Sequence, residues 1–234
     1  MSAGLPRLLI VTGLQREADI AAGAGSFAIC SGGSPGLLRE RLTALGDTVG
    51  DIAGILSFGL AGGLAPHLQS GDMIAVTHVT SDEGRHDTHE HWYDSIVAAV
   101  SGAMALHHGG LGGSESVIVN ASGKQALHSA TGALAVDMES HIAAAFAKLH
   151  NLPFAAIRAV SDPANRSLPQ LATQALRPDG GVDYLKVLSG IARDPLQMSS
   201  LIAAGRDSGR AFSALRRVRG LLGPLFGFRG ADFR

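Results

Sequence analysis

Residues 135–162 read AVDMESHIAAAFAKLHNLPFAAIRAVSD, and the fold can be predicted outward from this stretch. Ala133–Val136 and Phe154–Val160 are short apolar runs of strand length, and about Ser140–His150 between them has a helical pattern. Both runs are apolar at nearly every position, which is typical of strands buried on both faces. The stretch therefore predicts a strand–helix–strand unit within a largely parallel sheet.

The same alternation continues toward both ends of the chain. Further strand-length runs are Leu8–Val11, Phe27–Cys30, Ile55–Gly59, Met73–Val79 and Ser116–Val119, and further helical patterns are about Pro35–Leu45, Trp92–His107 and a series from Leu168 to Leu222. Alternating strands and helices predict a three-layer α/β sandwich with a central mixed, largely parallel sheet. We interpret residues 1–204 as one domain and residues 205–234 as a basic, apolar C-terminal tail.

Composition narrows the class of protein. Hydrophobic residues make up 46% of the chain and charged residues 17%, which argues against disorder. The formal net charge of −1 gives no basis for nucleic-acid binding. Cys30 is the only cysteine, so an intrachain disulfide cannot form and a reducing compartment fits. No run approaches the roughly 18 apolar residues of a membrane span, and no signal peptide is recognisable, so we expect a cytoplasmic protein.

Ligands of open α/β sheets bind beyond the carboxyl ends of the strands, so the polar residues there are candidates for a site. Glu17 follows the first strand and is either a base of the site or a first-turn acid that complements a helix dipole. The glycines at 59, 62 and 63 follow another strand and allow a ligand to approach the backbone closely. Their spacing matches neither a dinucleotide fingerprint nor a P-loop.

Two further strands also end in acidic residues. Asp137 and Glu139 lie at a strand-to-helix junction, where Asp137 could cap the helix and Glu139 could accept hydrogen bonds from a ribose diol. Asp162 emerges from an apolar strand, where partial desolvation suits a general acid. The alternative is that Asp162 only forms a turn before Pro163.

Three segments resemble the purine and uridine phosphorylase superfamily. They are TGLQREA (12–18), SFGLAGGLAPHLQSGDMI (57–74) and AVDMESHIAAAFAKLHNLPFAAIRAVSD (135–162). They are most similar to the methylthioadenosine/S-adenosylhomocysteine nucleosidase branch and, within it, to the hopanoid-associated phosphorylases, which are linked to removal of adenine from adenosylhopane. The resemblance implies cleavage of a purine nucleoside, either small or lipid-linked, by a homo-oligomer, with a dimer favoured.

The resemblance also implies roles for individual residues. Asp162, oriented by Ser161, would protonate the purine N7, and Glu17 would activate the attacking water. Glu139, preceded by Met138, would bind the ribose hydroxyls. The loop formed by Gly59, Leu60, Ala61 and Gly62 would line the sugar and acceptor side. No metal or cofactor is expected.

The acceptor could be water or phosphate. Several relatives have serine or threonine at the position of Leu60, which cannot donate a hydrogen bond. This departure from the family pattern favours water. Backbone amides of Cys30–Gly36 could still bind an anion, so phosphate stays an alternative as co-substrate.

Two other segments carry competing interpretations. The polar run Asp82–His91 contains metal-ligating residue types, but a solvated loop near the pocket is favoured. Residues 206–234 hold seven arginines and two aspartates, interleaved with large apolar residues. Such a segment fits peripheral contact with the inner membrane, or a helix that docks on the domain or on a second subunit.

Overall fold

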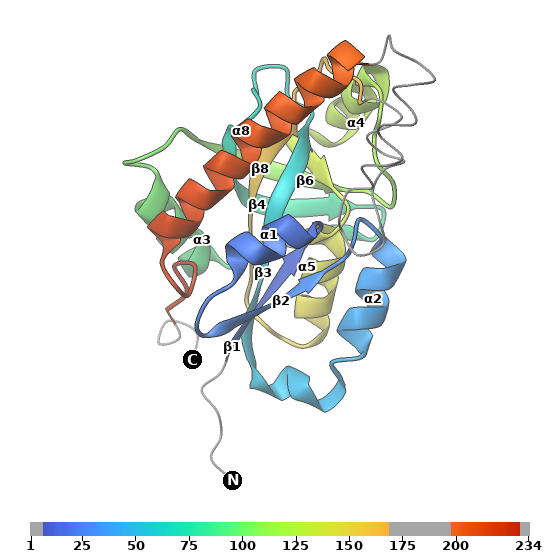
Figure 1. Ribbon diagram of the computed structural model, residues 1–234. Helices are drawn as coiled ribbons and strands as arrows, with labels where there is room; N and C mark the ends of the chain where they lie inside the picture. The colour runs from blue at the N-terminus through green and yellow to red at the C-terminus, as the bar shows by residue number, and fades with distance from the viewer. Residues whose placement is uncertain (1–6, 169–197, 230–234) are drawn as a thin grey trace.

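The computed structural model describes residues 7–168 and 198–229, which form a sheet flanked by helices (Figure 1). The strands are β1 (Arg7–Thr12), β2 (Ser26–Cys30), β3 (Ile52–Gly63), β4 (Met73–Ser81), β5 (Gly84–Asp87), β6 (Leu106–Gly113), β7 (Ala135–Asp137) and β8 (Phe154–Asp162). The helices are α1 (Gln15–Ala21), α2 (Pro35–Thr43), α3 (Glu90–Val100), α4 (Ala121–Thr131), α5 (Ser140–Leu149) and α8 (Met198–Leu222), with a 3-10 helix over Gly46–Asp51.

The sheet is mixed, as predicted. Strands β2, β1, β3 and β8 lie side by side and parallel, and β4 is antiparallel to β8 and β5 but parallel to β6. Strand β7 is parallel to β6 and pairs antiparallel with the end of β3. Strands β3, β8, β4, β6 and β7 therefore close a ring, and β2, β1 and β5 extend the sheet outside it.

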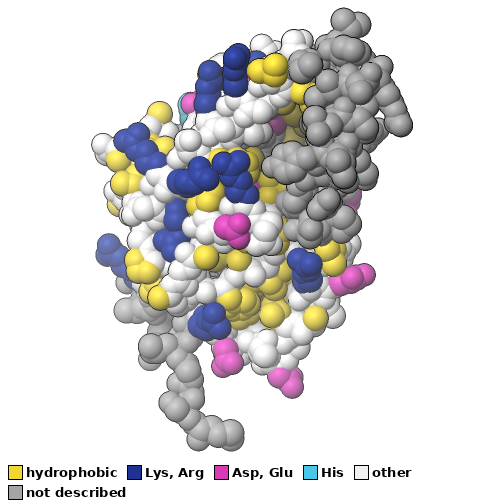
Figure 2. All heavy atoms as spheres, in the orientation of Figure 1, with side chains coloured by type: hydrophobic (Ala, Val, Ile, Leu, Met, Phe, Trp, Pro, Cys, Tyr) yellow, Lys and Arg dark blue, Asp and Glu magenta, His cyan; other side chains and the backbone are white. Residues whose placement is uncertain are grey.

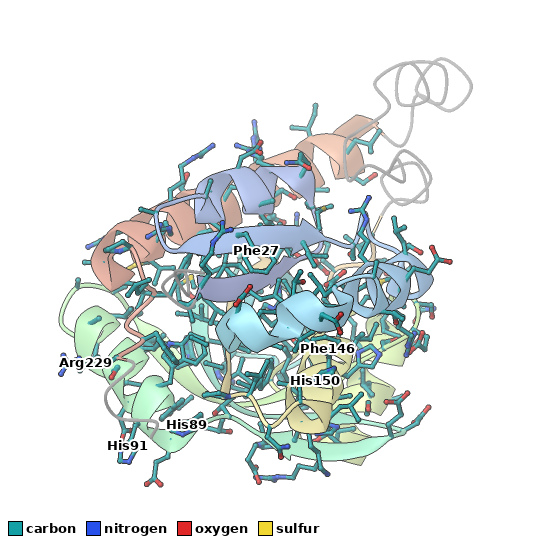
Figure 3. All side chains as sticks on the ribbon, turned by 90° about the horizontal axis from the view of Figure 1, so that it is seen from below. Phe27, His89, His91, Phe146, His150 and Arg229 are labelled. Carbon is teal, nitrogen blue, oxygen red and sulfur yellow. The ribbon has the colours of Figure 1, made fainter. Side chains whose placement is uncertain are left out.

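Two apolar cores, one on each face of the sheet, make the three layers that the sequence predicts. Alternate residues of a strand point to opposite faces. In β8, Ala155, Ile157 and Ala159 enter the core beneath α1, α3 and α8. Phe154, Ala156 and Val160 enter the core beneath α2 and α5. Figure 3 shows the helices covering the two faces, seen from below.

Helix α8 corrects the prediction of a separate tail. It runs without interruption from Met198 to Leu222, so the predicted boundary after residue 204 falls inside a helix. Its inner side chains, including Leu215 and Val218, are fully buried in the core over β8. Beyond the helix, the ring of Phe228 packs 4.8 Å from that of Trp92. The described part of the tail is thus an integral layer of the domain, because its apolar residues cover the sheet.

The arginines of this segment lie on its outer side. Arg206, Arg210, Arg216 and Arg217 are exposed. Figure 2 shows basic side chains gathered along α8 and beside α1. No helix within residues 7–168 and 198–229 is long and apolar enough to cross a membrane. Most apolar residues of this segment are buried in the core, as expected for a helix that docks on the domain.

One predicted strand and one predicted helix end are wrong. Ser116–Val119 forms a loop. The strand of this region is β6, which lies between β4 and β7 and includes His107, where a helix was predicted to end. Strand β6 has the sequence LHHGGLGG, which has little strand propensity. Close packing requires glycine at two of its positions, since a Cβ on Gly109 or Gly113 would lie 2.6 or 2.5 Å from the side chains of Leu134 or His141, respectively. Helix α4 was not predicted, because it has no clear apolar face.

Candidate active site

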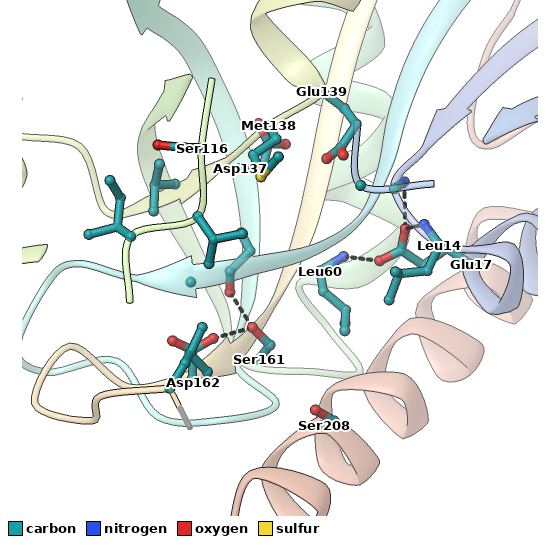
Figure 4. A pocket seen from close by; sticks show the side chains of 18 of the residues that line it. Leu14, Glu17, Leu60, Ser116, Asp137, Met138, Glu139, Ser161, Asp162 and Ser208 are labelled. Atoms are coloured by element: carbon teal, nitrogen blue, oxygen red, sulfur yellow. Dashed lines mark hydrogen bonds between the residues drawn. The ribbon is translucent and has the colours of Figure 1, made fainter. Parts of the chain in front are cut away.

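A cavity of about 270 Å³ lies where β1, β7 and β8 end and beside the last residues of β3 (Figure 4). Its volume is near the lower end of the range, roughly 300–1,000 Å³, that is typical of small-molecule sites. The candidates from the sequence that line it are Glu17, Leu60, Ala61, Gly62, Met138, Glu139, Ser161 and Asp162. The structure thus brings together residues from four separate parts of the chain.

Glu17 is buried and held by three backbone amides. Its Oε2 accepts hydrogen bonds from the amides of Gly13, at 2.7 Å, and Leu14, at 2.8 Å. Its Oε1 accepts one from the amide of Leu60 at 2.8 Å. Burial raises the pKa of Glu17 above its ordinary value, although the nearby Arg158 and these three amides act to lower it. Glu17 therefore lies both at the start of α1 and in the wall of the cavity, so its two interpretations from the sequence coexist.

Gly59 lies directly behind Glu17, outside the cavity lining. A Cβ at this position would be 2.5 Å from Nη1 of Arg158 and 2.7 Å from the Glu17 carboxylate, so no side chain fits. The neighbouring Leu60 supplies its backbone amide to Glu17, while its side chain packs against the core beneath α8. The polar contribution of Leu60 is thus made by the backbone.

Arg158 is a site residue to which the sequence analysis assigned no role. It lies on β8, is completely buried, and pairs with Asp137 at 2.5 Å between Nη2 and Oδ2. Among the described residues, none accepts a hydrogen bond from its Nε or Nη1. A charged residue within an otherwise apolar strand was the signal that could have identified it, because arginine is rarely buried without a partner.

Asp137 caps helix α5, the role that the sequence suggested for it. Its Oδ1 accepts the backbone amide of Ser140 at 3.1 Å. Because the same carboxylate pairs with Arg158, the start of α5 and the middle of β8 are tied together beneath the cavity.

Glu139 lies next to Glu17 and carries an unusual pKa. Its Oε1 accepts a hydrogen bond from the hydroxyl of Ser31 at 2.8 Å, and a Cβ on Gly13 would be only 3.0 Å from that oxygen. Burial, and then the negative charge of Asp137, raise the pKa of Glu139 from 4.5 to about 7. Glu139 therefore exchanges its proton near neutral pH.

Asp162 lies at the other end of the cavity. Its Oδ1 is 2.5 Å from the hydroxyl oxygen of Ser161, and its Oδ2 contacts Nζ of Lys124. The side chains of Lys124 and Asp162 are 1% and 5% exposed, so this ion pair is shielded from water. Lys124 comes from α4 and was missed, because nothing in the local sequence indicates that its side chain is buried.

The cavity thus has two chemically different ends. Figure 4 shows Glu17 and Glu139 on one side, Asp162 and Ser161 on the other, and Leu60 between them. Carboxylates at one end can stabilise positive charge, while an acid at the other can stabilise a leaving group that gains negative charge.

The polar run 82–91 takes no part in this cavity. Part of it forms β5, which pairs with β4, and His91 is exposed at the start of α3 (Figure 3). The expectation of a loop near the pocket is therefore corrected. The described parts of the chain contain no group of three or more histidine, cysteine, aspartate or glutamate side chains that could hold a metal ion.

Comparisons with known proteins identify relatives. The family model described as the phosphorylase superfamily matches residues 38–179. No curated protein matches the chain. Among solved structures, the futalosine hydrolase of Helicobacter pylori has a TM-score of 0.69 and 13% identity, over 96% of this chain and 98% of that chain.

Two nucleosidases are also similar in fold. The 5′-methylthioadenosine/S-adenosylhomocysteine nucleosidase of Helicobacter pylori has a TM-score of 0.67 and 14% identity, over 94% of this chain and 97% of that chain. Its counterpart from Neisseria meningitidis, in complex with methylthio-immucillin-A, has a TM-score of 0.66 and 14% identity, over 92% of this chain and 98% of that chain. At these identities the likeness concerns the fold alone.

Proposed function

The chain belongs to the phosphorylase superfamily, and we propose that it cleaves the N-glycosidic bond of a purine nucleoside with water as the acceptor. The observation that carries this proposal is the pair of opposed ends in one cavity, with Glu17 and Glu139 facing Asp162. The similar structures from Helicobacter pylori and Neisseria meningitidis are hydrolases and nucleosidases by name, which supports the same reaction class.

The arrangement matches the charges that develop when such a bond breaks. The sugar becomes positively charged, and Glu139 both accepts hydrogen bonds from ribose hydroxyls and stabilises this charge. The purine gains the electron pair of the bond, and Asp162 donates a proton to N7 as the base leaves. General acid catalysis of this kind typically contributes about 10²–10⁴-fold in rate.

Water as acceptor is supported by the hydrogen bonds of Glu17. The amides of Gly13, Leu14 and Leu60 would suit a bound anion, but the Glu17 carboxylate already occupies them. The amides of Ser31 and Gly33 are also engaged, with the carbonyls of Thr12 and Gly13. A phosphate would therefore meet negative charge, whereas a water in the cavity can donate a hydrogen bond to Glu17.

An apolar group on the sugar is supported by the rest of the lining. The cavity wall includes Leu14, Leu60, Val117, Ile118, Val136, Leu168 and Ala204. Val117 is 45% exposed, so the apolar wall extends to the mouth of the cavity. We therefore assign adenosylhopane as the substrate, a nucleoside whose lipid part would lie along this wall while adenine is released.

The test is adenine release from adenosylhopane by the purified protein, with and without phosphate. Asp162→Asn removes the acid, and Asp87→Asn, at an exposed position of β5, is the matched control. The proposal predicts release without phosphate that is lost only in Asp162→Asn. Release that requires phosphate would refute water as the acceptor, and no release would refute the assignment of this substrate.

A general methylthioadenosine/S-adenosylhomocysteine nucleosidase is the second candidate, favoured by the names of the similar structures. A comparison of kcat/KM for 5′-methylthioadenosine, S-adenosylhomocysteine and adenosylhopane separates the two. A higher value for either soluble nucleoside would assign the chain to the second candidate. A non-catalytic nucleotide-binding protein would cleave none of the three.

We also propose a cytoplasmic homodimer that contacts the inner membrane peripherally. The exposed arginines of α8 support the membrane contact, since basic residues near an anionic membrane each contribute about 1 kcal/mol. The variant Arg206→Gln/Arg216→Gln should co-sediment less with anionic liposomes than the control Arg85→Gln. Equal sedimentation would refute the contact, and a monomer mass by light scattering would refute the dimer.

A further inference from the structure

Lys124 contacts the cavity residue Asp162 without itself lining the cavity, and it has no role in the mechanism above. It is 0% exposed, although lysine is seldom fully buried. Its Nζ contacts Oδ2 of Asp162 and lies 3.0 Å from the carbonyl oxygens of both Pro163 and Arg166. Two carbonyl oxygens of the segment that follows β8 thus accept hydrogen bonds from the same amine.

These three acceptors match the three N–H groups of an ammonium ion. In this ion-pair form, Asp162 accepts a hydrogen bond on both oxygens, from Lys124 and from Ser161. A carboxylate in that state has no proton to give to a leaving purine. The proton that acid catalysis requires must therefore reach Asp162 from a neighbouring group.

The neighbouring groups can also hydrogen-bond to the neutral form of the pair, in which Lys124 is an amine and Asp162 a carboxylic acid. Ser161 Oγ is 2.5 Å from Oδ1 of Asp162 and 3.1 Å from the carbonyl oxygen of Ala61. A hydroxyl has one proton, so Ser161 can donate to Ala61 and accept from a protonated Asp162. A neutral Lys124 amine keeps two N–H groups for the carbonyls of Pro163 and Arg166.

We propose that Lys124 supplies the proton that Asp162 delivers to the purine, an inference that rests on the proposed function. An N–H bond of the ammonium breaks and an O–H bond forms on Asp162. Rotation about its Cβ–Cγ bond then exchanges the two oxygens. This O–H bond breaks as N7–H forms, while the electron pair of the glycosidic bond moves to the purine. The neutral Lys124 regains its proton from water after the product leaves.

Lys124→Arg tests the proton transfer directly. Arginine keeps the positive charge but is not deprotonated in proteins, so Asp162 would stay a carboxylate. The two substrates are adenosylhopane and the p-nitrophenyl glycoside of the same hopane-substituted ribose, whose leaving group needs no proton. Adenine release should fall about 10²–10⁴-fold, as for loss of a general acid, while p-nitrophenolate release changes little. Lys148→Arg, at an exposed position of α5, is the matched control.

Lys124→Met provides a second variant, because arginine is the larger side chain. Without the cation, the buried Asp162 takes up a proton and becomes neutral, so adenine release should exceed that of Lys124→Arg. Adenine release by Lys124→Arg at the wild-type rate, or equal loss of both leaving groups, would overturn the inference. So would slower adenine release by Lys124→Met than by Lys124→Arg. A wild-type protein that cleaves neither substrate would refute the proposed function itself.

Discussion

Replacing Glu139 with glutamine removes one ionisable group from the sugar end of the cavity and keeps the volume of the side chain. The amide oxygen of glutamine can still accept the hydrogen bond of Ser31, which is 2.8 Å from Oε1 in the wild type. The substitution therefore isolates the effect of the charge. Burial and the neighbouring Asp137 raise the pKa of Glu139 from 4.5 to about 7.

The sign of the effect on stability follows from this direction. The folded protein binds the Glu139 proton more tightly than the unfolded chain does. This difference contributes to the free energy of unfolding in full below pH 4.5, and the contribution is lost as the pH rises through about 7. At about 1.4 kcal/mol per pH unit, the loss amounts to about 3 kcal/mol. Glu139→Gln has no proton to lose and should keep its stability over this interval.

Urea denaturation at pH 5 and pH 8 measures the difference. Between these two pH values, the free energy of unfolding of the wild type should fall by about 2.5 kcal/mol more than that of Glu139→Gln, which corresponds to roughly 5–10 °C in Tm for a chain of this size. The control is Glu83→Gln, whose side chain is 58% exposed and should leave the wild-type pH dependence unchanged. An identical pH dependence for Glu139→Gln and the wild type would refute the raised pKa.

Three further substitutions test other parts of the site and the fold. Glu17→Ala should lower adenine release about 10²–10⁴-fold and leave three amides without an acceptor, so that added formate, but not chloride, restores part of the rate; equal effects of the two salts would contradict this. Arg158→Met should destabilise the protein by about 3–5 kcal/mol in urea denaturation, because Asp137 becomes a buried charge without its cation, and a cost below 1 kcal/mol would argue against that pairing. Leu215→Ala should cost about 2–5 kcal/mol with no change in KM, whereas the exposed Leu221→Ala should cost far less.

Hydrophobic periodicity was sufficient to predict the class of fold. The buried strands β1, β3 and β8 are apolar on both faces, and α5 follows an acidic junction, so each element carries its own local signal. Strand β6 carries no such signal. Gly109, Gly110 and Gly113 are explained by the side chains of Leu134, His78 and His141, respectively, which come from elsewhere in the chain. A local pattern cannot reveal a requirement that only the assembled sheet imposes.

The candidate site likewise contains residues that the local sequence predicts and residues that it does not. Glu17, Glu139 and Asp162 were predicted because each follows a strand, and parallel strands bring their ends together. Lys124 lies on α4, which lacks a distinct apolar face, and its ion pair with Asp162 spans 38 residues of sequence. The partners of a buried charge are determined by tertiary contacts, so they become visible only in the structure.

The position of α8 has a consequence for the synthesis of the protein. The core beneath it combines Leu8 and Ile10, near the beginning of the chain, with Leu222 and Phe228, near its end. During translation, β1 and β3 emerge long before the helix that covers them. One face of the nascent sheet therefore stays open to water, and to other chains, until α8 has left the ribosome. A chain terminated before α8 would expose an apolar surface to chaperones and proteases.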